Sequence, residues 1–260
     1  MDKTPRDHPA VEHMWRGAGV ESGGRCRSQR HRRRWPWTFI LSALLLASLS
    51  VLADDNPTFI HRDSFIAAHP DLYWRRQGVR DYVRGRHAEA MKAFQRAAKY
   101  ADKPSQAMIA QMLWNGDGVP ADPVMAYAWA DLSAERGYPV FVATREKFWS
   151  ELDADQRRAA VAKGQAIFDE YADDVAKRRE EKALLLARRQ ITGSRTGHVG
   201  ALIVKQVNHS TGQTDDTEGV LYYADKYWQP EQYWQWQDNH WLPDPKEKVE
   251  VGPIRVPPGK

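Results

Sequence analysis

The chain has 260 residues, of which 38 are Lys or Arg and 34 are Asp or Glu, with a formal net charge of +4 and a pI near 9.1. The positive excess comes from residues 1–53, which hold nine basic and four acidic residues. Residues 54–260 hold 29 basic and 30 acidic residues, so the net charge of that part is near −1. This balance does not favour a nucleic-acid partner. Cys26 is the only cysteine, so residues 54–260 have no disulfide and no thiolate chemistry.

Residues 1–53 have the form of a secretory signal peptide. A basic stretch over residues 30–34 precedes the apolar run WPWTFILSALLLASLSVLA, which ends in a Val-x-Ala pattern at Ala53. We expect cleavage between Ala53 and Asp54 and export, to the periplasm of a bacterium. The alternative is an uncleaved inner-membrane signal anchor, because the run from Trp35 is nearly long enough to span a bilayer. That leader would be the only contact with a membrane.

Two short helices joined by a loop are predicted for residues 106–137, after a loose polar segment at 54–69. Asp122 is a good N-cap for the second helix, because its carboxylate can accept the free N–H groups of the first turn. Pro123 follows it, at a position where the missing N–H of proline is not needed. Gly137 stands where a glycine usually ends a helix.

The loop between these helices and their buried faces can also be predicted. Gly116 and Gly118 permit backbone angles that other residues resist. Small residues on one face of each helix allow close contact between helices, and a tryptophan fills the groove. The positions that we expect to be structural are Ala107, Leu113, Gly116, Gly118, Asp122, Ala126, Trp129, Ala134 and Gly137.

With Val119, these residues carry a resemblance to the Sel-one-like repeat, a relative of the tetratricopeptide repeat. The G-x-G-V-x-x-D loop and the A-x-x-W-x-x-x-x-A-x-x-G helix occur together at the spacing of that family. The resemblance covers one repeat, about an eighth of the chain. It implies a right-handed α-solenoid of helical hairpins, with a concave face that holds partner proteins.

A repeat should have neighbours, and a period of 36 residues places one on each side. Moving back 36 residues from Ala126 leads to Ala90, in a helical pattern that ends a first unit. Moving forward 36 residues from Ala107 leads to Ala143, in a divergent third unit. In that unit, Asp153 and Gln156 stand at the spacing of a capping box. We therefore predict a repeat region at 70–171, and a mainly α fold built as a short solenoid.

The segments after the repeats differ from them in composition. Residues 172–190 predict a polar helix that closes the end of the stack, since a terminal unit needs a solvated outer face. Residues 191–219 are rich in glycine and predict a linker, with a short strand at 201–207 where β-branched residues gather. The C-terminal part is expected to be irregular or to contain β-structure.

Residues 220–260 hold an aromatic-rich segment followed by a tail. One interpretation is a sugar-stacking platform, because apolar ring faces with nearby amides suit polyhydroxylated ligands. The other interpretation, which we favour, is packing of these rings onto the helices or into a small β-unit. The candidate ligand-binding residues are Tyr222, Tyr223, Tyr227, Trp228, Tyr233, Trp234, Trp236 and Trp241.

No motif indicates catalysis. None of the six histidines after residue 54 forms an H-x-x-x-H pair, so no zinc site is predicted. No serine lies in a G-x-S-x-G elbow, and the glycines at 193, 197 and 200 follow no strand and make no dinucleotide fingerprint. We predict no catalytic residue, no metal and no cofactor.

Two functions from different classes remain. The first is a non-enzymatic protein–protein interaction adaptor of the bacterial cell envelope, built on the repeats, with protein partners. The second is a binder of envelope glycan, such as peptidoglycan, that uses the aromatic C-terminal segment. An envelope hydrolase is a third hypothesis, for which the sequence offers no motif.

Overall fold

The computed structural model describes residues 58–190, 199–200, 202–207, 212 and 214–242. The chain divides into two compact units, Met1–Ile60 and His61–Lys260, and apart from residues 58–60 every described residue belongs to the second unit. The predicted signal peptide, its cleavage site and the tail from residue 243 lie outside the described residues. None of the helices in the described part is long and apolar enough to cross a membrane.

The first helical hairpin consists of α3 (Pro70–Val83) and α4 (His87–Ala98). It follows the short helices η1 (Thr58–His61) and α2 (Asp63–Ala67). Pro70 stands in the first turn of α3, where its missing N–H costs no hydrogen bond. In α4, Ala90, Phe94 and Ala97 recur at helical spacing and are buried, and this stripe packs α4 against α3 and α5.

The second hairpin consists of α5 (Lys103–Asn115) and α6 (Pro123–Ser133), with the short helix η2 (Ala134–Arg136) after it. Both α-helices begin at an aspartate N-cap. Asp102 accepts a hydrogen bond from the Ser105 N–H and Asp122 accepts one from the Met125 N–H, each at 3.0 Å. The N-cap that the sequence predicted at Asp122 is therefore present.

The residues of this repeat that we expected to be structural are mostly buried, and its glycines have backbone angles in the left-handed region. The alanines and the tryptophan at Ala107, Ala126, Trp129 and Ala134 are buried, and Leu113 is half-buried. Gly116, Gly118 and Gly137 have φ of +76°, +72° and +71°. Trp129 reaches the third unit, where its ring lies 4.8 Å from that of Tyr171.

The third hairpin consists of α7 (Pro139–Glu151) and α8 (Ala154–Tyr171). The predicted capping box is formed: Asp153 accepts from the Gln156 N–H at 2.8 Å, and the Gln156 side chain accepts from the Asp153 N–H at 3.0 Å. Helix α8 packs against α6, and a Cβ added at Gly164 would lie 3.7 Å from the Ala128 Cβ, in ordinary van der Waals contact. Stacked hairpins of this kind confirm the mainly α fold class.

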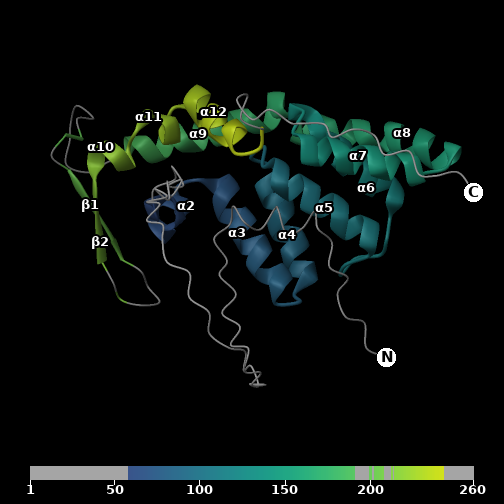
Figure 1. Ribbon diagram of the computed structural model, residues 1–260, viewed down its shortest axis with the longest axis horizontal. Helices are drawn as coiled ribbons and strands as arrows, with labels where there is room; N and C mark the ends of the chain where they lie inside the picture. Colours follow the sequence, from purple (N-terminus) through teal and green to yellow (C-terminus); the bar gives the residue numbers. More distant parts are fainter. Residues whose placement is uncertain (1–57, 191–198, 201, 208–211, 213, 243–260) are drawn as a thin grey trace, which may run out of the picture. The chain divides into compact units, whose positions relative to one another are not determined.

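Segment 172–190, predicted as a capping helix, forms α9 (Asp173–Arg189). Besides α8, it contacts α3 of the first hairpin and α11 near the C-terminus (Figure 1). Its buried positions Ala176, Glu180 and Leu184 are four residues apart and face one direction. The helix thus runs back along the stack, as well as lying at its end.

A two-stranded antiparallel sheet follows, made of β1 (Ile203–Val207) and β2 (Thr214–Glu218), in which Ile203 pairs with Glu218. The first strand falls within the predicted 201–207, whereas β2 occupies residues expected to be linker. Its sequence, TDDTE, has no apolar alternation that could have indicated a strand. Gln206 ties the sheet to α2 through a 2.9 Å hydrogen bond to Ser64 Oγ.

The aromatic segment itself is helical, and the β-structure expected in the C-terminal part is the preceding two-stranded sheet. It forms α10 (Gly219–Tyr222), α11 (Asp225–Trp228) and α12 (Pro230–Asn239), which we call the C-terminal strap, residues 219–242 (Figure 1). Pro230 begins α12, and Tyr233 and Gln237 are buried one turn apart. The small β-containing part of the fold is the sheet that precedes the strap.

We expect Gly118→Ala to destabilise the protein more than Gly137→Ala. Both positions have positive φ, which costs about 1–2 kcal/mol for a residue with a Cβ. A Cβ on Gly118 would also lie 2.2 Å from the His87 Cβ, whereas nothing lies within 4 Å of one on Gly137. Urea unfolding measures both variants; equal losses of unfolding free energy would contradict the close approach of the Gly118 loop to α4.

Candidate functional site

The candidate ligand-binding rings lie mostly inside the protein. Five are buried, namely Tyr222, Tyr227, Trp228, Tyr233 and Trp234, and Tyr223, Trp236 and Trp241 are half-buried. A sugar-stacking platform needs exposed ring faces, and the buried rings do not offer them. The favoured packing interpretation therefore describes most of this segment.

One group of these rings packs around α2 and the start of α3. The ring of Phe65 makes edge contacts with Tyr227 at 5.4 Å and with Trp228 at 5.9 Å, and stacks on His69 at 4.1 Å. The two nitrogens of His69 lie 2.8 Å from the Phe65 carbonyl oxygen and 2.9 Å from that of Tyr227. Burial lowers the pKa of His69, and the neutral ring donates to one of these carbonyls.

Helix α12 crosses the N-terminal ends of three repeat helices, a surface that we call the docking edge. At α3, the Tyr233 hydroxyl donates to Asp71 Oδ2 at 2.6 Å. At α5, Trp234 shares a buried cluster with Ala101, next to the N-cap residue Asp102. At α7, the Tyr138 hydroxyl donates to Asp238, and the ring of Trp241 lies 5.2 Å from Phe141.

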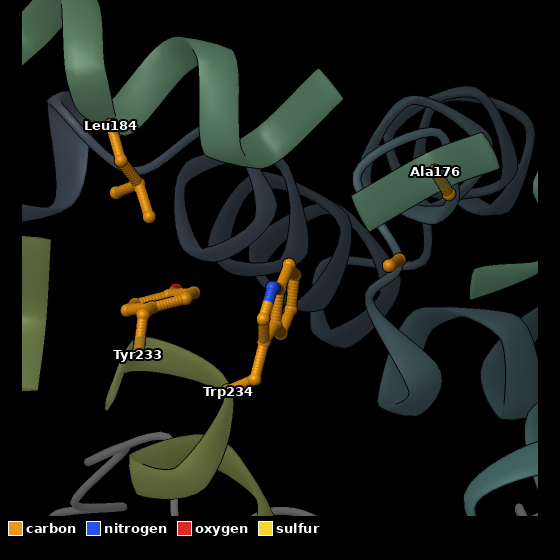
Figure 2. Packing of buried hydrophobic residues seen from close by; sticks show 5 residues of the cluster. Ala176, Leu184, Tyr233 and Trp234 are labelled. Carbon is orange, nitrogen blue, oxygen red and sulfur yellow. The ribbon is translucent and has the colours of Figure 1, made fainter. Parts of the chain in front are cut away.

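Helix α9 lies beside α12 and completes the site. Figure 2 shows Leu184 of α9 and Tyr233 of α12 facing each other, with Trp234 beside them. The indole N–H of Trp234 donates to Glu181 at 3.1 Å, and the Arg136 guanidinium lies 4.8 Å from the centre of its ring. Trp234 is therefore held by an acceptor at its edge and a cation over its face.

Three buried carboxyl groups meet at the α3 end of the docking edge. Asp71, Asp102 and Glu180 are 1%, 4% and 0% exposed, and the Arg75 guanidinium lies 3.2 Å from Asp102. Burial, and then the neighbouring Asp71, raise the pKa of Glu180 well above its ordinary value. Burial also raises the pKa of Asp102, against the opposing effect of Arg75.

A charge-balanced cluster lies at the junction of α5, η2 and α9. Lys103, whose side chain is fully buried, lies 2.6 Å from Glu135 and 3.0 Å from Asp173, and also donates to the Leu132 carbonyl at 3.2 Å. Arg136 donates to both carboxylate oxygens of Asp173, at 2.6 and 3.0 Å. Burial opposes ionisation of Asp173, but these partners hold its pKa well below the usual range.

A small cavity lies between these two clusters. Its volume is about 10 Å³, and its walls include Asp71, Asp102, Arg136, Tyr138 and Gln237. A polar cavity of this size has room for about one water molecule. At this point of the docking edge, the strap therefore leaves room for about one water molecule.

The site offers polar contacts but no metal-binding or nucleophilic arrangement. In the described ranges no group of three or more His, Cys, Asp or Glu side chains could hold a metal ion. The repeat residues expected to be structural lie in α5, in α6 and in the turns beside these helices, and none of them makes the site contacts described above. The charged residues of the docking edge were not predicted. The sequence offered one sign of a buried charge: Glu180 stands one helical turn from Ala176 and one from Leu184, on the apolar face of α9.

Comparisons with known proteins add little to this description. No protein-family model and no curated protein matches the chain. One solved structure, a protective antigen present in uropathogenic Escherichia coli strains and displaying an SLR fold, is similar at 22% identity with a TM-score of 0.38. The match covers 51% of this chain and 28% of that one, so the chain spans under a third of that protein.

We expect Lys103→Met to lower the unfolding free energy by about 2 kcal/mol, because it removes the charged partner of Glu135 and one of the cations that bind the half-buried Asp173. Lys177→Met is the matched control, since Lys177 also lies 3.0 Å from Asp173 but its side chain is 28% exposed. Exposed ion pairs contribute at most about 1 kcal/mol. Chemical denaturation at pH 7 compares the two, and similar losses would contradict the assigned importance of Lys103.

Proposed function

We propose that the protein is a non-enzymatic protein–protein interaction adaptor of the bacterial cell envelope. The observation that carries this proposal is that the docking edge already holds a helix, α12, at the starts of α3, α5 and α7. Tyr233 donates to Asp71, Trp234 packs beside Ala101 just before α5, and Asp238 accepts from Tyr138. A surface that binds one amphipathic helix in this way suits the helical segments of other proteins.

The resemblance of residues 106–137 to the Sel-one-like repeat supports the same role. Repeat stacks of this kind present extended surfaces and need no catalytic group. Consistent with this, Lys103, Arg136 and Asp173 of the site are engaged in ion pairs with one another. The partner that we propose is a protein, and neither a cofactor nor nucleic acid is part of the proposal.

The envelope location is proposed from the leader sequence. Residues 1–53 combine a basic stretch, an apolar run and a small-residue ending, and the remainder has no cysteine. Cleavage after Ala53 would release a periplasmic protein, and an uncleaved leader would anchor it in the inner membrane. Either outcome places the repeats on the outer side of that membrane.

Binding of envelope glycan is the second candidate, and one observation favours keeping it. Tyr223, Trp236 and Trp241 remain half-buried on a strap that also carries amide side chains. Partly exposed rings beside amides can stack on sugars. The burial of the other five candidate rings makes this the weaker proposal.

A retention experiment separates the two functions. The chain from residue 54 onward is immobilised and exposed to envelope extract before and after protease digestion, and to purified peptidoglycan. For an adaptor, we expect retained protein that protease digestion removes, and no binding of peptidoglycan. Peptidoglycan binding that survives protease treatment, and that falls at least tenfold in Trp236→Ala, would instead identify a glycan binder and overturn the adaptor.

A further inference from the structure

Exposed apolar side chains gather at the end of α9, at the start of β1 and on α10. Across the residues that the structure describes, five large apolar side chains on these elements are between 43% and 56% exposed. Single exposed apolar residues are ordinary, whereas a group of them on neighbouring elements marks an interaction surface. We call this group the apolar end patch: Leu185, Leu186, Ile203, Val220 and Leu221.

The contacts between these elements bring the patch together. The Gly219 N–H donates to the Leu202 carbonyl at 2.6 Å, which places the start of α10 against the start of β1. A Cβ on Gly219 would lie 2.8 Å from the Leu202 Cβ, so a side chain there would prevent this approach. An ion pair of 3.1 Å between Arg188 and Asp225 joins the last turn of α9 to α11, which follows α10 (Figure 1). The end of α9, the start of β1 and α10 therefore lie close together.

The patch is separate from the core that holds the strap. Leu184 is buried and faces Tyr233, whereas the next two residues of α9, both leucines, are exposed. Tyr222 is buried in the same way, whereas the two apolar residues before it in α10 are exposed. The folded chain therefore fills its core without the side chains of the patch, and a partner outside that core is needed to cover them.

Positive charge is concentrated on the helical side of the patch. Residues 182–189 of α9, KALLLARR, hold three cations and no acidic residue. Lys182 and Arg189 are exposed, and so is Lys226 of α11, whereas the acidic Asp225 of α11 is paired with Arg188. The acidic side chains near the patch are mainly those of β2, on its other side. Exposed leucines beside cations are typical of surfaces that bind bilayers with anionic headgroups.

We propose that the apolar end patch rests on the surface of a lipid bilayer that contains anionic headgroups. Its apolar side chains enter the boundary between headgroups and acyl chains, and the cations of α9 and α11 stay beside the phosphates. The bilayer is the membrane that the leader enters. The proposal therefore depends on the leader and not on the adaptor function or on the docking edge.

The place of the leader in the chain favours a bilayer over a protein as the occupant. Eight residues lead from Ala53, the end of the apolar run, to His61, and eight extended residues span at most about 29 Å. Helix α2 follows directly, and its Phe65 ring lies 5.8 Å from that of Tyr222, the residue after Leu221. The chain thus enters its folded part beside α10 and the patch.

A retained leader would keep the patch within reach of the bilayer. A contact of this kind needs little affinity of its own, because the anchor supplies a high effective concentration of lipid. Cleavage after Ala53 would leave the patch to bind the bilayer alone, weakly and reversibly. The patch is thus a second membrane contact, in addition to the leader.

Fluorescence of single labels in the full chain tests this contact. The only cysteine is replaced by Cys26→Ser, and the chain is made by cell-free synthesis with vesicles of phosphatidylethanolamine and phosphatidylglycerol, which the leader enters. An environment-sensitive dye is attached at Leu221→Cys or, as the matched control, at Val161→Cys. These side chains are 56% and 65% exposed, and α8, which carries the control, lies at the far end of the folded part from α10 (Figure 1). We expect nitroxide-labelled lipids to quench the dye at position 221 by about twofold or more, and to leave the dye at position 161 unquenched.

Two double variants separate contact by the patch from simple tethering by the leader. Leu185→Ser with Leu186→Ser keeps the tether but removes two exposed apolar side chains, so quenching at position 221 should fall towards the level at position 161. Lys182→Ser with Arg189→Ser should weaken quenching on the anionic vesicles and have no effect on vesicles of phosphatidylcholine. All four positions are exposed, so the fold should tolerate both changes.

The proposal is overturned if the two labelled positions are quenched equally, or if either double variant leaves the quenching at position 221 unchanged on anionic vesicles. A change of emission at position 221 that rises with protein concentration, without quenching by lipid, would identify a second copy as the occupant instead. A change that requires envelope extract and disappears after protease digestion would identify a protein partner. None of these results bears on the docking edge, so the adaptor function stands or falls by its own retention experiment.

Discussion

The alignment of three helix N-termini along one edge is the constraint on which the rest of the site depends. The first N–H groups of α3, α5 and α7 have no partners within their own helices, and the helix dipoles add partial positive charge there. Carboxylates are favoured at such positions, and Asp71 in the first turn of α3 and Asp102 at the N-cap of α5 are found there. The strap and α9 then cover the edge, and that cover buries the carboxylates and their partners together.

Burial has opposite consequences at the two ends of this edge. Near η2, Lys103 and Arg136 balance Glu135 and Asp173, and each charge has a partner within 3.2 Å. Near α3, Asp71, Asp102 and Glu180 are buried, and Arg75 lies 3.2 Å from Asp102. Burial raises the pKa of Asp102 and of Glu180, whereas the partners of Asp173 in the first cluster hold its pKa below the usual range. One edge therefore holds a well-paired ionic anchor for α9 and, at its other end, carboxyl groups whose neutral forms burial favours.

The sequence predicted the parts of the fold that local chemistry determines. The N-cap at Asp122 and the capping box at Asp153 were identified because each involves residues three apart. The docking edge could not be predicted in this way, because Tyr233 and Asp71 are 162 residues apart and no local pattern relates them. The high aromatic content of the strap indicated burial or binding, but not the helical period that Tyr233 and Gln237 share.

Glu180 illustrates why a buried acid at this position requires an explanation beyond stability. Ala176 and Leu184 lie one turn on either side of it, and an apolar residue at 180 would continue their stripe without the cost of burying a carboxyl. A continuous apolar stripe would also let α9 shift by one turn with little loss of contact. The carboxyl interrupts the stripe, and a one-turn shift would move it to the place that Ala176 or Leu184 now occupies. A buried polar group of this kind favours one register of a helix at a cost in stability.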